Sequence, residues 1–251
     1  MRTSPAPTLL LAGLSLTLLA SAASAVPVPA GDTELLPGTT SAVSPELAGI
    51  VIHDDTTAYY DLDPQPLFIA GHHYQNRVVR SDVTGSVIIS PRLRDPFNTS
   101  GGDVVVDGFS IDGYAGWTTA IDYRTDSLGD VGPTFVQRSA DGDTLTFTFG
   151  FPLLLGNLVQ EIQQESLFIN VLTDAPAFET TGRATFFGRS EAYPGQILQV
   201  SIGGIAVPAA ARMPLPAPLA LMLAGLVGTT LVRRGRNRPQ HRLAVRHAGA
   251  G

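Results

Sequence analysis

The chain contains no cysteine and no lysine among its 251 residues. Without cysteine, disulfide bonds, thiolate metal sites and a cysteine nucleophile are all excluded. Without lysine, the phosphate-binding loop of nucleotide hydrolases is excluded as well, because that loop needs a lysine. Charged residues make up only 15% of the chain, below the ~25% that is usual for soluble domains. Location and fold therefore have to be inferred from the distribution of charge and from hydrophobic patterns.

Acidic residues are missing from both ends of the chain. All 22 Asp and Glu residues lie between Asp32 and Glu191, whereas six of the 16 arginines lie in the last 19 residues. The segment from Val26 to Ala211 has 8 arginines against 22 acids, which gives it a net charge of −14. A domain this acidic repels nucleic acid and anionic lipid, so we expect no nucleic-acid partner. A solvated, self-repelling surface is the simplest explanation of the charge.

The first 25 residues predict a secretory signal peptide. Arg2 precedes an uncharged run from Leu9 to Ala20, and small residues follow at Ala23 and Ala25. This order of regions is read by the Sec translocon and signal peptidase, and it predicts cleavage after Ala25. The apolar run of 12 residues is shorter than the ~20 residues that a spanning helix requires. A retained N-terminal anchor is therefore the less favoured alternative.

A second apolar run, Leu215–Val232, has 18 residues without a charge and precedes the basic tail 233–251. A run of this length can just cross a bilayer, and the positive-inside rule places the tail in the cytoplasm. The arginines that orient it are Arg233, Arg234, Arg236 and Arg238. We expect a Pro-rich linker at 209–218 and a single transmembrane helix with its core at 219–232. A buried core helix is the alternative, but such a helix would alternate with polar residues.

Directly before this run stands the segment Met213-Pro214-Leu215-Pro216-Ala217. It resembles the sorting signal of the PEP-CTERM family in its Val-Pro-Leu-Pro-Ala variant (VPLPA-CTERM), with Met213 in place of valine. The resemblance implies recognition by an exosortase-type membrane protease of a Gram-negative bacterium. It implies transient anchoring in the inner membrane, followed by delivery to the cell surface or the exterior.

The prolines of this motif keep the backbone extended, a conformation that suits a protease cleft. The chain departs from the family pattern after the arginine cluster, because it continues from Gly235 to Gly251. A simple type I anchor with a Pro-rich linker is the alternative to sorting.

Residues 50–208 predict one all-β domain, an antiparallel β-sandwich of jelly-roll-like type. Runs rich in Val, Ile, Thr and Phe recur at the spacing typical of sandwiches. The runs are Ile50–His53, Leu67–Ala70, Gln75–Val79, Ser86–Ser90, Val104–Asp107, Thr118–Tyr123, Thr134–Arg138, Thr144–Phe149, Ser166–Leu172, Ala184–Gly188 and Ile197–Ile202. Asp141-Gly142 separates two of them, and threonine alternates with larger apolar residues over Thr144–Phe149. This pattern predicts a hairpin with one buried face.

Two segments depart from the strand pattern. Residues 26–49 are rich in Pro, Gly, Ser and Thr, which predicts a flexible, exposed leader. Leu155, Leu158, Val159 and Ile162 recur at helical spacing, which predicts one short helix that ends by Glu165.

Three aromatic residues, Tyr114, Trp117 and Tyr123, cluster around two glycines and are candidates for a sugar-binding platform. The alternative is that the single tryptophan lies in the core.

Metal binding has only weak signals in this sequence. The histidines available are His53 and the adjacent pair His72-His73, but neighbours on a strand point to opposite faces. Aspartates gather as Asp61/Asp63, Asp103/Asp107/Asp112, Asp122/Asp126/Asp130 and Asp141/Asp143. Loop carboxylates suit calcium, although none of these groups has the spacing of a dedicated calcium loop, and Asp-Gly is equally expected in turns. We predict no metal site and no cofactor, with calcium as the one alternative.

Motifs for catalysis are also missing: there is no Gly-x-Ser-x-Gly elbow and no His-Glu-x-x-His. The sequence therefore predicts a non-enzymatic surface or biofilm-matrix protein with a structural or adhesive role beside exopolysaccharide. One alternative is a carbohydrate-binding β-sandwich on a simple type I anchor. A second alternative is a glycan-active hydrolase that uses two aspartates.

Overall fold

Thirteen strands and one short 3-10 helix, η1 (Pro45–Leu47), make up the regular structure of the residues described by a computed structural model. The structure describes residues 25–62, 69–99, 102–156 and 162–211. The chain divides into two units, 1–210 and 211–251. Within the described ranges, no helix has the length and hydrophobicity that crossing a bilayer requires.

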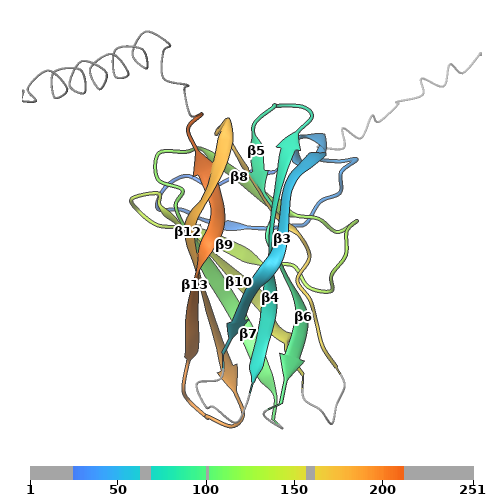
Figure 1. Ribbon diagram of the computed structural model, residues 1–251, viewed down its shortest axis with the longest axis vertical. Helices are drawn as coiled ribbons and strands as arrows, with labels where there is room; N and C mark the ends of the chain where they lie inside the picture. Colours follow the sequence, from blue (N-terminus) through green and yellow to red (C-terminus); the bar gives the residue numbers. More distant parts are fainter. Residues whose placement is uncertain (1–24, 63–68, 100–101, 157–161, 212–251) are drawn as a thin grey trace, which may run out of the picture. The chain divides into compact units, whose positions relative to one another are not determined.

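Seven strands form one antiparallel sheet (Figure 1). Its order is β1 (Val26–Pro27), β8 (Thr119–Tyr123), β11 (Ile169–Thr173), β5 (Val87–Ile89), β4 (Ala70–Ser81) and β3 (Gly49–Asp61), with β6 (Arg92–Asn98) also paired to β4. Strand β4 is therefore shared by three neighbours. Its outer face becomes the floor of the site described below.

Six strands form the second antiparallel sheet. Its order is β13 (Leu198–Ala209), β12 (Ala177–Ser190), β7 (Val104–Asp112), β10 (Thr144–Leu154), β9 (Phe135–Arg138) and β2 (Thr33–Leu35). The chain passes from one sheet to the other several times, because β7 follows β6 and β8 follows β7 in the sequence.

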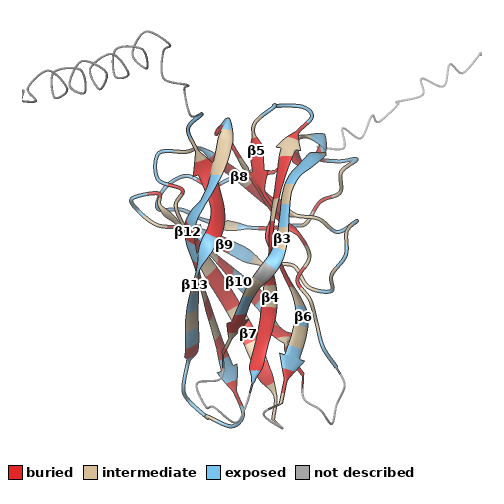
Figure 2. Cartoon of the chain, viewed as in Figure 1, coloured by how far each residue is buried: buried red, intermediate tan, exposed pale blue. Residues whose placement is uncertain are grey.

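The two sheets bury one shared core, which appears as the red inner positions of the strands in Figure 2. Tyr60 of β3 stacks on Phe186 of β12 with ring centroids 3.6 Å apart. Asn76 of β4 donates to the Gly204 carbonyl and accepts from the Ala206 amide, at 3.1 and 2.8 Å. Buried aromatic pairs contribute about 0.5–1.5 kcal/mol beyond their burial. Aromatic stacking and an amide bridge therefore join the sheets.

The β9–β10 hairpin is confirmed. Asp141-Gly142 lies between the two strands, with Gly142 at φ 76°, and Leu145 pairs with Arg138 across the hairpin. Leu145, Phe147 and Phe149 are buried, whereas the threonines between them are half-buried or exposed. A strand places successive side chains on opposite faces, which is why this alternation could be read from the sequence.

Residues 26–49 differ from the expected flexible leader, because they form part of the fold. Strand β1 pairs with β8, and β2 pairs with β9. Val28, Leu36 and Leu47 are at most 5% exposed. These short edge strands show no hydrophobic period of their own, so their docking depends on partners supplied by the rest of the chain.

Arg138 supplies one such partner. It is 5% exposed, and all five of its N–H donors have acceptors at 2.7–3.2 Å: the carbonyls of Gly142, Val28, Tyr114 and Trp117, and the Thr119 hydroxyl. None of these acceptors is a carboxylate. Four carbonyl dipoles and one hydroxyl therefore solvate a buried cation, and the Val28 carbonyl ties the N-terminal segment to it.

The short helix expected over 155–165 is absent from the described part of that segment. Strand β10 continues to Leu154, and residues 162–165 have no regular structure, while 157–161 lie outside the described residues. The backbone amide of Leu154 donates to Gln164 Oε1 at 3.0 Å, and the backbone amide of Gln164 donates to the Leu154 carbonyl at 2.9 Å. Gly156 turns the chain at φ 77°. The described residues on both sides of 157–161 are therefore not helical.

Candidate functional site

Most residues of the predicted terminal signals lie outside the described residues. These are Ala23, Met213, Pro214, Leu215, Pro216, Ala217, Arg233, Arg234, Arg236 and Arg238. Ala25 is described: it is 3% exposed, and its amide donates to Glu46 Oε1 at 3.2 Å. Strand β1 begins at Val26, the residue that follows the predicted cleavage position.

The three rings expected to form a sugar platform do not share a surface. Tyr114 is fully buried in the core, so it presents no face to a ligand. Trp117 is half-buried and packs against the core. Tyr123 is half-buried, and a Cβ added at either Gly38 or Gly132 would lie within 2.6 Å of its ring. The two glycines are therefore needed for close packing around Tyr123.

His72 and His73 point to opposite faces of β4, as the strand period requires. His72 is fully buried; its Nε2 donates to the Gln164 carbonyl at 3.3 Å, and burial lowers its pKa from 6.5 to about 3. His73 lies on the outer face, where its ring is 5.4 Å from that of Tyr59. His53 packs instead against Phe178. The histidines are thus separated.

The aspartates serve as hydrogen-bond acceptors for the backbone and for arginines. Asp122 accepts from the Gly38 and Tyr123 amides at 2.9 and 2.8 Å, while burial raises the pKa of its carboxyl. Asp141 accepts from the Ser139 hydroxyl in the hairpin turn. Nowhere in the described ranges do three His, Asp or Glu side chains gather to hold a metal ion.

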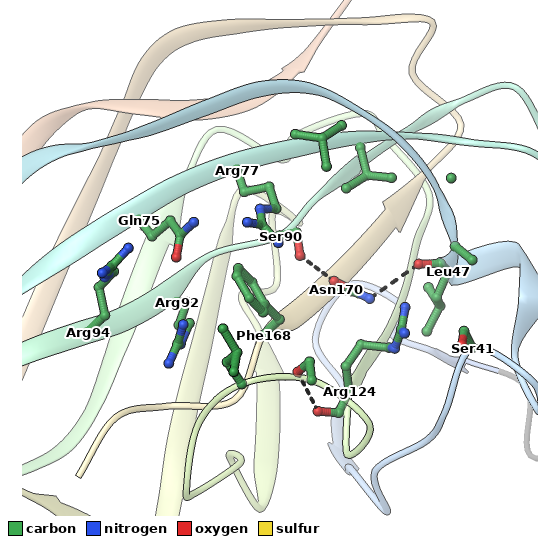
Figure 3. Close-up of a pocket in the computed structure, with 16 residues that line it drawn as sticks. Ser41, Leu47, Gln75, Arg77, Ser90, Arg92, Arg94, Arg124, Phe168 and Asn170 are labelled. Carbon is green, nitrogen blue, oxygen red and sulfur yellow. Dashed lines mark hydrogen bonds between the residues drawn. The ribbon is translucent and has the colours of Figure 1, made fainter.

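A basic pocket lies on the outer face of the seven-stranded sheet (Figure 3). We call it the arginine pocket, after the four arginines that line it: Arg77 of β4, Arg92 and Arg94 of β6, and Arg124 after β8. Its volume is about 520 Å³, within the range of about 300–1,000 Å³ that small-molecule sites occupy. No Asp or Glu occurs among its described lining residues. Half of the eight arginines in a strongly acidic domain thus gather around one hollow.

Each of the four guanidinium groups is paired with one carboxylate outside the pocket lining. The pairs are Arg77–Asp54, Arg92–Glu165, Arg94–Asp95 and Arg124–Asp126. The carboxylates bind through Nε, Nη2 or both, so Nη1 of each arginine has no partner among the described residues. The four Nη1 atoms are also accessible, since none of them belongs to the set of buried polar atoms without a partner. Four accessible N–H donor groups therefore remain available.

Phe168 forms the centre of the pocket in Figure 3. The guanidinium carbon of Arg77 lies 4.1 Å from its ring centroid, and that of Arg92 lies 5.4 Å away. A guanidinium over an aromatic face gains about 0.5–1 kcal/mol at an exposed site and more when desolvated. The ring therefore positions two cations side by side, and the carboxylates of Asp54 and Glu165 reduce the repulsion between them.

Gln75 contributes an oxygen atom to the same pocket. The residue is 4% exposed, and its Nε2 donates to Asp54 Oδ1 at 2.7 Å. That bond identifies the nitrogen of the amide, because a carboxylate accepts and does not donate. Gln75 Oε1 is buried and has no partner in the part of the chain that the structure describes. An unpaired buried acceptor costs about 1–3 kcal/mol, and a donor group that reached this oxygen would remove that cost.

One side of the pocket is formed where residues 38–41 run beside 123–126. Thr39 and Arg124 form a parallel bridge, and the Ser41 amide and hydroxyl both donate to Asp126 Oδ2 at 3.0 and 2.8 Å. Asp126 also accepts from Arg124, and this hydrogen bond holds the pKa of its carboxyl well below the ordinary value. Arg124 is thus oriented by a carboxylate that also binds the N-terminal segment.

A second hollow adjoins the arginine pocket on the same face. Its lining includes the exposed rings of Tyr59 and Phe97, which are 40% and 46% exposed, beside Asp95 and Glu165. Both carboxylates are already bound to pocket arginines. Exposed rings flanked by carboxylates thus occur here rather than around Trp117.

The sequence contains a signal for part of the arginine pocket in the spacing of its residues. Gln75 and Arg77 are two residues apart in one strand, and Arg92 and Arg94 are two apart in another. Period two places each pair on one face of its strand. Arg124 carried no such signal, because its place depends on the pairing of residues 38–41 with 123–126.

Comparisons of this chain with protein-family models, with curated proteins and with solved structures give no match.

Proposed function

We propose that the chain is an exported, non-enzymatic protein of the cell surface or extracellular matrix, and that its β domain binds exopolysaccharide. The observation that carries this proposal is the arginine pocket: four arginines around a hollow whose described lining contains no acid, with Nη1 of each lacking a partner among the described residues. A cavity with converging polar groups is the usual form of a binding site. The aromatic hollow beside it supports a saccharide ligand, because exposed rings offer apolar faces to sugars.

The route of export is proposed from the two ends of the chain. The predicted signal peptide ends at Ala25, one residue before strand β1, so cleavage there removes Ala25 and leaves all thirteen described strands intact. The resemblance of residues 213–217 to the VPLPA-CTERM motif supports release by an exosortase-type protease after transient anchoring through Leu215–Val232. For the domain itself we propose a jelly-roll-like sandwich, supported by the repeated crossing of the chain between the two sheets.

The mass of the protein recovered from the cell surface tests this route. We expect a chain that begins at Val26 and lacks the residues beyond about Ala217. The substitution Pro216→Leu, inside the motif, is expected to leave the arginine tail attached. Pro218→Leu, just outside the motif, is the matched control and is expected to be processed normally. If wild-type protein retains its tail at the surface, sorting is excluded and a simple type I anchor remains.

Association with polysaccharide is tested on the same material. We expect the wild-type protein to sediment with the organism's exopolysaccharide, and to be released when that polysaccharide is digested. If it stays soluble in the presence of the polysaccharide, the proposed adhesive role is wrong, whatever the mass measurement shows.

A further inference from the structure

We infer that the arginine pocket binds an acidic saccharide, with the carboxylate of a uronic acid residue held by its arginines. The inference deepens the function proposed above and depends on it in one respect, that the natural ligand is exopolysaccharide. It follows from the donors and acceptors that the pocket leaves unpaired.

The unpaired donors suit an anion or a strong acceptor. Arg77, Arg92, Arg94 and Arg124 each keep Nη1 without a partner among the described residues, and each is already held in place by its own carboxylate. A planar carboxylate accepts guanidinium hydrogen bonds in pairs, and such charge-assisted bonds are about twice as strong as neutral ones. A ligand carboxylate can therefore bind without displacing the protein's own acids.

The unpaired acceptors require hydroxyl groups on the same ligand. Gln75 Oε1 has no partner. The hydroxyls of Ser41, Ser90 and Ser127 also line the pocket, and each uses its proton inside the protein: on Asp126, on Asn170 Oδ1 and on the Arg124 carbonyl, respectively. Toward a ligand these serine oxygens can only accept. Ionised sulfate and phosphate have few protons or none to donate, whereas a uronic acid carries several hydroxyls beside its carboxylate.

The acidic character of the domain restricts the ligand further. A net charge of −14 over residues 26–211 repels polyanions at long range, but charges beyond about 8 Å are largely screened at physiological salt. Close to the pocket, the four pairs of arginine and carboxylate have no net charge. Binding is therefore decided by short-range hydrogen bonds, which favours a polyhydroxylated carboxylate over a nucleic acid, whose binding depends on the charge of many phosphates.

The experiment is calorimetric titration of the full-length protein with a short oligogalacturonate. Its methyl ester is the matched probe, because it keeps every ring hydroxyl and removes the charge. A glutamate peptide of equal charge tests carboxylates that come from a protein, and inorganic sulfate tests a free inorganic anion. We expect oligogalacturonate to bind at least about tenfold more tightly than any of the other three, since each lacks either the carboxylate or the set of hydroxyls.

Variants connect the binding to the pocket. Arg77→Gln and Arg124→Gln are expected to weaken oligogalacturonate binding about tenfold each, because each removes a charged donor. Gln75→Met, which removes the unpaired oxygen, is expected to reduce the preference for oligogalacturonate over the glutamate peptide. Arg189→Gln is the matched control: Arg189 is also paired with an aspartate, Asp107, but lies outside the pocket, and its loss is expected to leave binding unchanged.

Four results would overturn the inference: no binding of oligogalacturonate, equal binding of its methyl ester, equal binding of the peptide or sulfate, or an Arg189→Gln effect as large as that of Arg77→Gln. The proposed function fails separately. A protein that sediments with exopolysaccharide but ignores oligogalacturonate keeps its proposed function and loses this ligand. A protein that binds oligogalacturonate but is not exported keeps the site and loses the proposed location.

Discussion

Arg138 and the arginines of the pocket use the same side chain in opposite ways. Arg138 is buried, and all five of its donors are satisfied by carbonyls and one hydroxyl. The pocket arginines lie on the outer face of the sheet, and although Arg92 is as buried as Arg138, the other three are half-buried. Each pairs with a carboxylate, and its Nη1 has no partner among the described residues. A fully satisfied cation stabilises a fold but has nothing left for a ligand. A partly satisfied one contributes less to stability and can bind.

The two kinds of arginine differ in what their removal would leave behind. At Arg138, removal of the side chain would leave the Gly142 and Trp117 carbonyls without a donor among the described residues, and it would take one of two donors from the Val28 and Tyr114 carbonyls. At the pocket, removal of one arginine frees a carboxylate that water can reach, because Asp54, Asp126 and Glu165 are 32%, 31% and 26% exposed at their side chains. The free energy of unfolding should therefore respond very differently to the two kinds of substitution.

The largest effect is expected at the buried arginine. Arg138→Met keeps the unbranched stem of the side chain but removes the guanidinium group and its five hydrogen bonds, and we expect the free energy of unfolding to fall by about 3–5 kcal/mol. Urea unfolding followed by the fluorescence of Trp117 measures this. Arg189→Met, at an exposed arginine, is the control and should leave the midpoint nearly unchanged. Equal shifts for both variants would contradict the role assigned to Arg138.

A smaller effect is expected from the buried histidine, and it depends on pH. The pKa of His72 is about 3 in the fold and about 6.5 when unfolded. Between these two values the unfolded chain binds a proton that the folded chain does not bind. Protonation of this histidine therefore leaves the free energy of unfolding unchanged above pH 6.5 and lowers it on acidification toward pH 3. The loss is about 1.4 kcal/mol per pH unit within that window, or about 2 kcal/mol between pH 6.5 and 5.

His72→Phe isolates this contribution from that of the carboxylates, which titrate in both proteins. Phenylalanine can keep the stacking on Tyr60 but cannot be protonated, so its stability curve should be flatter than wild type between pH 6.5 and 5. Urea unfolding at a series of pH values measures the difference. Parallel curves would mean that His72 is protonated in the fold.

The smallest effect on stability is expected at the pocket. Arg77→Gln removes an ion pair with Asp54 on the surface and a contact with the Phe168 ring. Such pairs contribute about 0–1 kcal/mol, so we expect the free energy of unfolding to change by less than about 1 kcal/mol. The same urea experiment measures it. If the free energy of unfolding fell as far as in Arg138→Met, Arg77 would be a residue that stabilises the fold, and its assignment to binding would be contradicted.

Much of the strand pattern could be predicted from the sequence, because alternation is a local property. The run Thr144–Phe149 and its Asp-Gly turn gave the β9–β10 hairpin correctly. Strand β6 was missed, since Arg92-Leu93-Arg94 has one apolar residue between two charges and resembles a loop in composition. In the fold, Leu93 is buried and the arginines face outward, which is the alternation of a strand with a polar outer face.

The aromatic trio shows the limit of composition as a guide to a site. Tyr114, Trp117 and Tyr123 are close in sequence, but burial separates their roles: one is in the core, one packs on it, and one is enclosed by glycines. The residues that do line a hollow, such as Gln75, Arg92 and Phe168, come from distant parts of the chain. No local pattern records that they meet.

The sequence by itself determined the class of the domain, its acidic charge and the two-residue period that assigns side chains to inner and outer faces. These follow from the residues and from the geometry of a single strand. Only the tertiary structure decided that residues 26–49 join the sheets, that Arg138 is buried and that four arginines share one pocket. Those outcomes depend on hydrogen bonds between residues far apart in the chain, such as Val28 with Arg138 and Ser41 with Asp126. Contacts of that kind form only when both sheets are in place.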